Sequence, residues 1–121
     1  MNKIQALHSF WSGFGWTAYD ATTVPDNAQL PYITYEVSDS DFGGFVALTA
    51  NLWTRSTSWA EITQKELEIA EYIGRGGLMI PYQDGAFWVQ KGRPWSTRLS
   101  DDNGDDSIRR IVLNVEIEFI D

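Results

Sequence analysis

The chain has 121 residues, 43% of them apolar, a formal net charge of -8 and no cysteine. This length suits one domain, residues 1–121, with one core. Without cysteine there are no disulfides, zinc–thiolate sites or cysteine nucleophiles. The excess of 17 acidic over 9 basic residues argues against binding to nucleic-acid phosphates. No stretch is long enough for a membrane span, and the N-terminus lacks the apolar run of a signal peptide, so a soluble intracellular origin is expected.

The first half of the chain predicts one helix followed by two strands. Residues 2–12 are expected to be helical, with Asn2 as the N-cap and with Ile4, Leu7, Trp11 and Phe14 on one face. Residues 17–30 are polar and are expected to be irregular. The stretches "PYITYEV" (31–37) and "FVALTANLWTR" (45–55) alternate between polar and apolar residues. This alternation predicts two strands that pair as a hairpin with a long connection.

The second half predicts a longer helix and a strand-rich end. Ser58 and Glu61 have the spacing of a capping box, and Gly74 follows the last apolar position of the helix. The residues expected to share the apolar arc of this helix are Trp59, Ile62, Leu67, Ile69, Ala70 and Ile73. Residues 78–91 read as a second hairpin with Asp84-Gly85 at its tip, and residues 108–120 as a long strand. The order of elements predicts an α+β domain, a mostly antiparallel sheet with two helices packed on one face.

The stretch "SDDNGDDS" (100–107) places four carboxylates around one Asn-Gly pair. Asp101, Asn103 and Asp105 have the 1, 3, 5 spacing of a calcium-binding loop, but Asp106 and Val112 stand where that loop needs glycine and glutamate. Asn-Gly favours a hairpin turn instead. The turn itself does not require the four charges. They are therefore either merely solvated or placed where negative potential is useful, and the candidate residues are Asp101, Asp102, Asp105 and Asp106.

The sequence offers no obvious catalytic constellation. His8 is the only histidine, and it lies among the apolar positions of the first predicted helix. A lone histidine without a nearby nucleophile or second ligand is usually structural. The glycines of "GRGG" (74–77) follow a helix instead of opening one, so they predict a helix stop, not a phosphate cradle. No enzyme activity, no cofactor and no metal site are expected.

Several residues are candidates for contacts between subunits. Glu66 falls on the apolar arc of the second helix, so either its stem packs while its carboxylate reaches water, or it forms an ion pair within or between subunits. Neighbouring strand residues point to opposite faces, so one of Phe87 and Trp88 must lie outside a one-sided core. The candidate interface residues are Glu66, Trp88, Trp95, Arg98, Arg109 and Arg110.

The segments "LPYITYEV" and "LWTRSTSWAEITQKELEIAEYI", in a chain of this size that opens with a short helix, resemble the tail terminator (tail completion or minor tail) proteins of siphophages and prophages. The resemblance implies an α+β subunit that forms a ring, usually a hexamer. Such a ring caps the tail tube, ends its polymerisation and joins it to the head connector, and DNA passes through without specific binding. It further implies a protein of the virion tail, assembled in the host cytoplasm, with no enzymatic activity, cofactor or membrane contact.

Within this resemblance, acidic loops that face the channel would let DNA slide, and the hairpin at 100–107 is a candidate for such a loop. Arginines 55, 75, 93, 98, 109 and 110 are candidates for ion pairs across subunit boundaries.

Two other classes of protein stay open on the sequence. One is a small acidic phage-encoded protein-binding module that acts on a host or virion partner. The other is an enzyme with a carboxylate-based site, which the lack of cysteine and the single histidine disfavour. A protein that closes into a ring needs two different, complementary surfaces, because head-to-tail contacts are heterologous.

Overall fold

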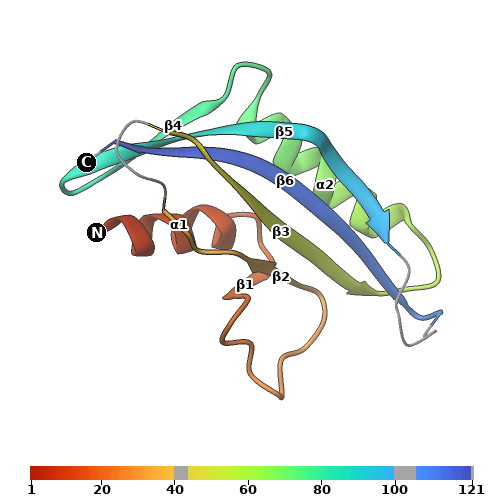
Figure 1. Cartoon of the computed structure of the whole chain (residues 1–121). Coiled ribbons are helices and arrows are strands. Elements are labelled where there is room, and N and C mark those ends of the chain that lie inside the picture. Colours follow the sequence, from red (N-terminus) through yellow and green to blue (C-terminus); the bar gives the residue numbers. More distant parts are fainter. Residues whose placement is uncertain (40–43, 100–105, 121) are drawn as a thin grey trace.

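The computed structural model describes residues 1–39, 44–99 and 106–120. In chain order these residues form α1 (Lys3–Ser12), β1 (Thr17–Asp20), β2 (Tyr32–Tyr35), β3 (Val46–Arg55), α2 (Ala60–Ile73), β4 (Leu78–Tyr82), β5 (Gly85–Leu99) and β6 (Ile108–Ile120). The two chain ends lie at the same end of the molecule, beside the turn between β4 and β5 (Figure 1).

The six strands form one sheet in the order β1-β2-β3-β6-β5-β4. Four of the five neighbouring pairs are antiparallel, whereas β1 pairs with β2 in parallel. The predicted α+β class is confirmed, but the sheet is mixed. The parallel edge strand falls in the segment expected to be irregular. With four residues and only Ala18 fully buried, β1 has too short an alternation to be recognised.

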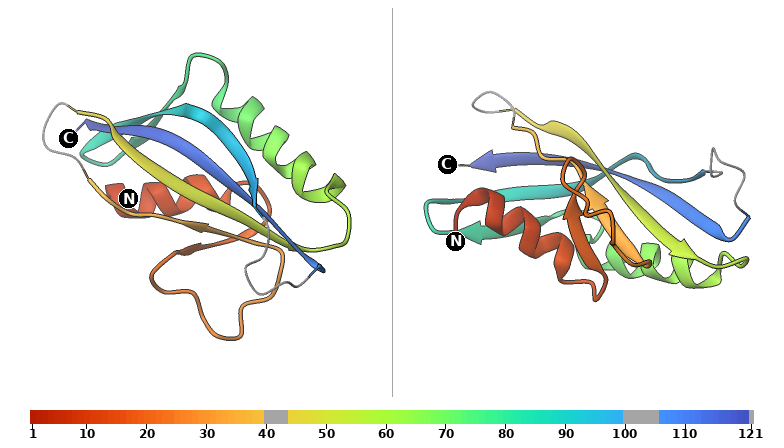
Figure 2. Two further views of the ribbon diagram at one scale, coloured as in Figure 1. Left: turned by 45° about the vertical axis from the view of Figure 1, so that its right-hand side comes forward. Right: turned by 90° about the horizontal axis from the view of Figure 1, so that it is seen from below.

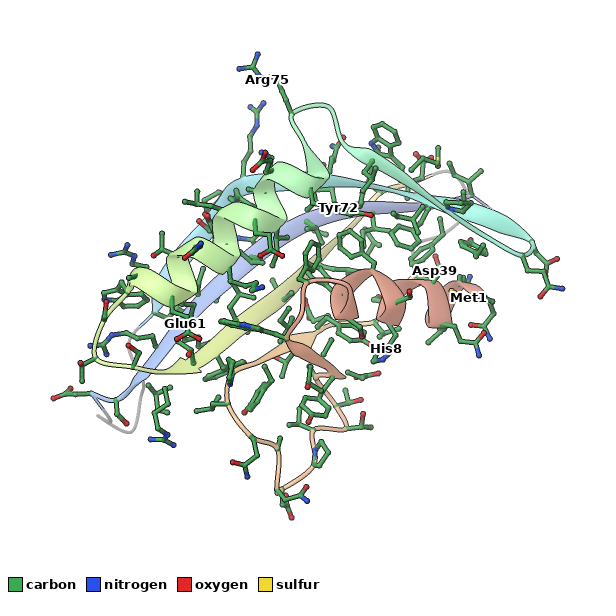
Figure 3. All side chains as sticks on the ribbon, turned by 180° about the vertical axis from the view of Figure 1, so that it is seen from behind. Met1, His8, Asp39, Glu61, Tyr72 and Arg75 are labelled. Carbon is green, nitrogen blue, oxygen red and sulfur yellow. The ribbon has the colours of Figure 1, made fainter. Side chains whose placement is uncertain are left out.

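Both helices cover the same face of the strongly curved sheet, as expected (Figures 2 and 3). The strands contribute every second residue to this covered face, and β6 follows the predicted alternation through Ile111, Leu113, Val115 and Ile117. The side chains most completely withdrawn from water are Trp11, Phe87, Leu7, Ile33, Leu52, Ile62, Ile69, Ile73, Leu113, Ile117, Val89 and Val115. Burial of these apolar side chains is the main stabilising contribution to the fold.

The expected apolar faces of the helices differ from the observed ones at two positions. Ile4 of α1 is 46% exposed and Leu67 of α2 is 59% exposed, so neither belongs to the core. The predicted capping box at Ser58 is also wrong. The helix begins at Ala60 after Trp59, and Ser58 Oγ accepts the backbone N–H of Ala60 at 3.0 Å. Trp59 packs against the core instead, which fixes the entry of the helix by packing and not by a side-chain cap.

The opposite face of the sheet has no covering layer among the described residues, and this leaves it available for other contacts. The pairing of β5 with β6 shifts register between Lys91 and Ser96, which marks a bulge that includes Pro94. At the sheet edge, Pro81 lies in β4, where proline is tolerated because an edge strand does not need every N–H.

Candidate assembly surfaces

Trp88 lies on the uncovered face of the sheet, while its neighbour Phe87 is fully buried under the helices. In register, Trp88 stands between Met79 of β4 and Glu118 of β6. Its indole Nε1 donates to Gln90 Oε1 at 3.3 Å. The sequence therefore identified correctly that one of two adjacent aromatic residues must leave the core. Trp88 and Met79, which is 45% exposed, give this face an apolar end.

Glu66 neither reaches water at a rim nor forms an ion pair within the described chain, and an ion pair between subunits stays a prediction. Its Oε1 accepts the Ser96 hydroxyl at 2.7 Å, and its Oε2 is buried without a hydrogen-bond partner. The carboxylate therefore does not reach water at a rim. It also forms no ion pair with Arg109 or Arg110, whose guanidinium groups bind elsewhere. The shift of register in β5 brings Ser96 under α2, and no sequence pattern marks that shift.

Trp95 packs against the core and is only partly exposed. Its indole Nε1 is buried and has no partner. Trp95 and Glu66 thus both belong to the layer between α2 and the β5 bulge, not to the outer surface. Any contact they make with another subunit would require this layer to open.

Arg98 and Arg109 both stack on Trp59, with guanidinium carbons 4.7 and 5.3 Å from the ring centroid. Arg98 also donates to Thr63 Oγ1 at 3.3 Å. Arg109 donates to the carbonyl oxygen of Thr57 at 2.8 Å. These cation–π contacts tie the start of α2 to β5 and β6. Both arginines therefore stabilise contacts within their own chain.

Arg110 points to the uncovered face of the sheet. Its Nε donates to Asn51 Oδ1 at 2.8 Å, and its guanidinium lies 4.7 Å from the ring centroid of Trp53. Trp53 in turn donates from Nε1 to Thr34 Oγ1 at 3.1 Å. Arg98 and Arg109 thus lie on the covered face of the sheet, and Arg110 lies on the opposite face.

Only one of the four predicted acidic loop residues can be placed. Asp106 is exposed in the turn before β6, and its carbonyl oxygen accepts from Arg109 Nη1 at 2.8 Å. Asp101, Asp102 and Asp105 lie outside the described residues, as do Asn103 and Gly104, on which the turn and calcium readings rest.

His8 takes part in a small polar cluster that sequence reasoning missed. Its Nδ1 lies 2.9 Å from the Tyr35 hydroxyl, and its Nε2 lies 3.2 Å from Ser12 Oγ. The serine and histidine are one helical turn apart on α1, and Tyr35 comes from β2. A Ser–His pair with an orienting third group is the pattern of nucleophilic catalysis, but His8 is exposed and lies at the surface. The cluster joins α1 to the sheet.

Beside this cluster lies a groove of about 820 Å³, which we call the α1–β1 groove. Its lining includes Ile4, His8, Ser12, Tyr19, Asp20 and Tyr35. Asp20 Oδ1 accepts from the Thr22 backbone N–H at 2.9 Å and from the Thr22 hydroxyl at 2.7 Å. These two hydrogen bonds lower the pKa of Asp20, so the groove carries a negative charge at neutral pH. Oδ2 of the same carboxylate has no hydrogen-bond partner among the described residues.

The negative charge of Asp20 affects the pKa of Tyr35. Burial raises the pKa of the Tyr35 phenol, and the nearby Asp20 carboxylate raises it further. Tyr35 is therefore neutral under ordinary conditions and serves as a hydrogen-bonding partner of His8.

A second groove, of about 560 Å³, runs between α1, the end of α2 and β4. Phe10, Phe14 and Ile80 contribute apolar lining, and Glu68 and Glu71 line its acidic side. Tyr72 lies between these groups and is 56% exposed. We call it the helix groove. Its aromatic lining is continuous with the core through edge contacts of Phe10 and Phe14.

Basic residues are distributed unevenly along the chain. Residues 4–54, which include β1, β2 and all of β3 except Arg55, contain no lysine or arginine. Eight of the nine basic residues therefore lie in residues 55–121, together with twelve of the 17 acidic residues; these residues include Arg55 at the end of β3, α2 and strands β4, β5 and β6. The side chains of three of these cations, Arg75, Lys91 and Arg93, have no hydrogen bond, ion pair or ring contact with another described residue. This segregation is visible in the sequence, although it gains meaning only from the strand order.

Among residues 1–39, 44–99 and 106–120, no three histidine, aspartate or glutamate side chains gather in a way that could hold a metal ion. No helix in these ranges has the length and apolarity needed to cross a bilayer.

Comparison with known proteins gives a fold likeness and no family. No protein-family model matches the chain, and no curated protein matches it. Among solved structures, a chain of the virion of a native gene transfer agent particle is similar, with a TM-score of 0.64 and 16% sequence identity. The similarity covers 98% of this chain and 91% of that chain.

At this identity the likeness establishes a shared fold over nearly the whole chain. The protein is thus an α+β domain with one uncovered sheet face, two surface grooves and unevenly distributed cations. More particularly, its fold is that of a chain found in a gene transfer agent virion.

Proposed function

We propose that this chain is a structural protein of a phage or phage-like virion, and that its role is that of a tail terminator. The observation that carries the proposal is the fold shared with a virion chain over 98% of the sequence. The resemblance of "LPYITYEV" and of the segment from Leu52 to Ile73 to tail terminators points in the same direction. In this role the protein works through contact surfaces, without catalysis or a cofactor.

In the proposed role, copies of the chain form a closed ring, with six subunits as the expected number. The ring caps the tail tube, stops its growth and offers a surface to the head connector. Ring closure requires two different surfaces that fit each other. The uneven distribution of cations supports this requirement, because residues 4–54 carry no lysine or arginine while residues 55–121 carry eight, which gives each subunit two unlike sides.

The excess of negative charge suits passage of DNA through such a ring. A net charge of -8 disfavours phosphate contacts, so a genome would slide without being held. In this proposal the segment 100–107, with Asp101, Asp102, Asp105 and Asp106, faces the channel. The exposed position of Asp106 is compatible with that orientation.

One observation favours a second candidate function. The helix groove combines an aromatic floor with the carboxylates of Glu68 and Glu71, and Tyr72 in its lining is largely exposed. This is the surface expected of a small acidic module that binds an amphipathic basic segment of a host or virion partner. Such a module would stay small in solution and would not recognise tube ends.

The test of the terminator role is binding to purified tail tubes. The mass of the protein is first measured across protein concentration and salt, and tubes incubated with it are then imaged by negative-stain electron microscopy. We expect ring-shaped density on one end of each tube and no further growth when tube protein is added. An unrelated protein of similar size and charge serves as the control. Tubes that keep bare ends and continue to grow at saturating protein would overturn the proposal.

A further inference from the structure

The loop between α2 and β4 presents one arginine at the margin of the molecule. Gly74 ends α2 with φ 78°, and Gly77 enters β4 with φ 93°, both in the region that favours glycine. Arg75 stands between them and projects away from the rest of the protein (Figure 3). It is exposed and has no hydrogen bond, ion pair or ring contact with a described residue.

The loop is also slim. No atom lies within 4 Å of the space that a side chain at Gly74 or Gly76 would fill. Another surface can therefore approach the backbone closely on both sides of Arg75. Lys91 and Arg93, on the β5 bulge, add two more cations without partners to the same half of the sheet.

The α1–β1 groove has the complementary chemistry. It contains the ionised Asp20, whose Oδ2 has no partner among the described residues, and it has Tyr19 and Tyr35 in its lining. A guanidinium group pairs well with a carboxylate oxygen while its plane rests on an aromatic ring. No lysine or arginine occurs in residues 4–54, so the stretch that supplies most of this groove brings no cation of its own to neutralise Asp20.

The two surfaces cannot meet within one chain. Arg75 projects from one margin of the protein, and His8 marks the α1–β1 groove on the other side of α1 (Figure 3). The strand order agrees, because β1 and β4 form opposite edges of the sheet. A contact between them joins two copies head to tail, which is the arrangement that closes a ring.

We propose that Arg75 of one copy enters the α1–β1 groove of the next copy and pairs with Asp20 there. The inference rests on the proposed ring function and specifies the contact that builds the ring. The partner is a second copy of this chain. The contact is polar and partly aromatic, so it orders the subunits around the ring and sets their direction.

The first test is charge reversal with exchange. Arg75→Glu and Asp20→Arg are each expected to weaken self-association about tenfold or more, and the double variant is expected to restore most of it. Association is followed by sedimentation velocity or native mass spectrometry, alone and on tail tubes. Arg93→Glu and Asp84→Lys are the matched controls, since they change the charge by the same amount outside the α2–β4 loop and the α1–β1 groove.

The second test uses the absence of native cysteine. Gly76→Cys places a thiol beside Arg75 in open space, and Thr23→Cys places one in the groove lining. Under mild oxidation the double variant is expected to form a ladder of disulfide-linked oligomers that ends at a closed ring. Each single variant gives at most dimers. Gly76→Cys combined with Asp84→Cys tests whether any exposed pair would do the same.

The outcomes separate this inference from the function on which it rests. Rings on tube ends that persist in both reversal variants, with no ladder from the Gly76–Thr23 pair, overturn the contact and leave the terminator role standing. A ladder and a rescued double variant without any binding to tubes support the contact and overturn the terminator role. Equal weakening by the two control variants would show general electrostatics and would also overturn the specific contact.

Discussion

Gly77 is the residue at which the chain leaves the α2–β4 loop and enters the sheet, and its neighbours leave no room for a side chain. A Cβ atom there would lie 2.7 Å from the Trp88 ring and 2.9 Å from the carbonyl oxygen of Val89. These contacts are shorter than van der Waals distances, and the backbone φ of 93° is itself unfavourable for other residues. Gly77 therefore allows Trp88 to lie flat against the strand on the uncovered face.

Replacement of Gly77 by alanine should lower the free energy of unfolding by about 2–4 kcal/mol, from backbone strain plus overpacking against Trp88. Gly76→Ala is the control, because nothing lies within 4 Å of its added methyl group. That control should change stability by less than about 1 kcal/mol. Urea denaturation followed by tryptophan fluorescence measures both. Equal stability of the two variants would mean that Trp88 does not occupy this position in solution.

Some buried polar side-chain atoms have no hydrogen-bond partner among the described residues. Glu66 Oε2, Trp95 Nε1 and Arg109 Nε are all buried without a protein partner. Each such group costs roughly 1–3 kcal/mol of desolvation that no hydrogen bond offsets. All three lie near the contact of α2 with β5 and β6. This layer is thus held by apolar packing and by Trp59, and its polar groups restrict how closely the elements approach.

At the scale of elements, α1 is attached to the sheet by burial and by one polar contact. Leu7, Phe10 and Trp11 pack into the core. On the other side of the helix, His8 reaches the Tyr35 hydroxyl of β2. The asparagine cap at Asn2 and its reciprocal bond with Gln5 start the helix as the sequence predicts. The helix is therefore fixed at its start, its buried face and its groove-facing side.

The raised pKa of Tyr35 leads to a prediction at this scale. Burial and the charge of Asp20 favour the neutral phenol in the folded state, so the pKa of Tyr35 lies above the ordinary tyrosine value of 10.0. The associated stability is fully present below that value and is lost as pH rises through the folded-state pKa. Asp20→Asn should shift the Tyr35 titration towards lower pH, because the repulsive charge is removed while an acceptor for Thr22 remains.

The measurement is the ultraviolet absorbance of ionised tyrosine during alkaline titration, at pH values where the protein stays folded. Tyr35→Phe identifies which part of the signal belongs to this residue among the five tyrosines. Asp26→Asn is the charge-matched control from the same acidic segment. A Tyr35 titration that does not move in Asp20→Asn would show that the carboxylate does not face the phenol.

How much of these elements the sequence predicts depends on how many residues carry each pattern. The alternation of Ile108–Ile120 spans 13 residues and predicts both the strand and its buried side. In α2, Ile62 and Ile69 are placed correctly, but Leu67 lies at the margin of the apolar arc, where one helix position decides between core and water. The four residues of β1 carry too little pattern to be recognised.

The candidate sites are less predictable for a physical reason. The β5 bulge between Lys91 and Ser96 changes which side chains face α2, and it depends on tertiary pairing with β6. Without it, the partners of Glu66 and Trp95 cannot be deduced. The α1–β1 groove likewise joins residues that are far apart in sequence, such as His8 and Tyr35. Single residues without a local sequence pattern are brought together into a site only by the topology of the fold, so the site cannot be predicted from the sequence.

For the whole molecule, the order β1-β2-β3-β6-β5-β4 turns a linear bias of charge into a spatial one. The segment without lysine or arginine forms one half of the sheet, and most of the cations are carried by the other half and by α2. Two β1 edges that meet symmetrically would bring carboxylates together without any cation from residues 4–54. A head-to-tail contact places cations such as Arg75 against the Asp20 side, so the distribution of cations favours head-to-tail association over a two-fold dimer.

This pattern predicts that self-association weakens with salt. The screening length falls from about 10 Å at 0.1 M salt to about 3 Å at 1 M, so the attraction between charged side chains of neighbouring copies becomes much weaker. We expect the apparent dissociation constant between copies to rise about tenfold or more over that range, measured by sedimentation velocity. Circular dichroism at each salt concentration controls for unfolding of the subunit.

An interface formed by apolar surfaces, such as Met79 and Ile120 on the uncovered sheet face, would respond in the opposite direction with sulfate, because excluded salts strengthen burial of apolar groups. Association that grows stronger in sodium sulfate and is unchanged in sodium chloride would therefore show that the uncovered face, and not the charged edges, holds the copies together.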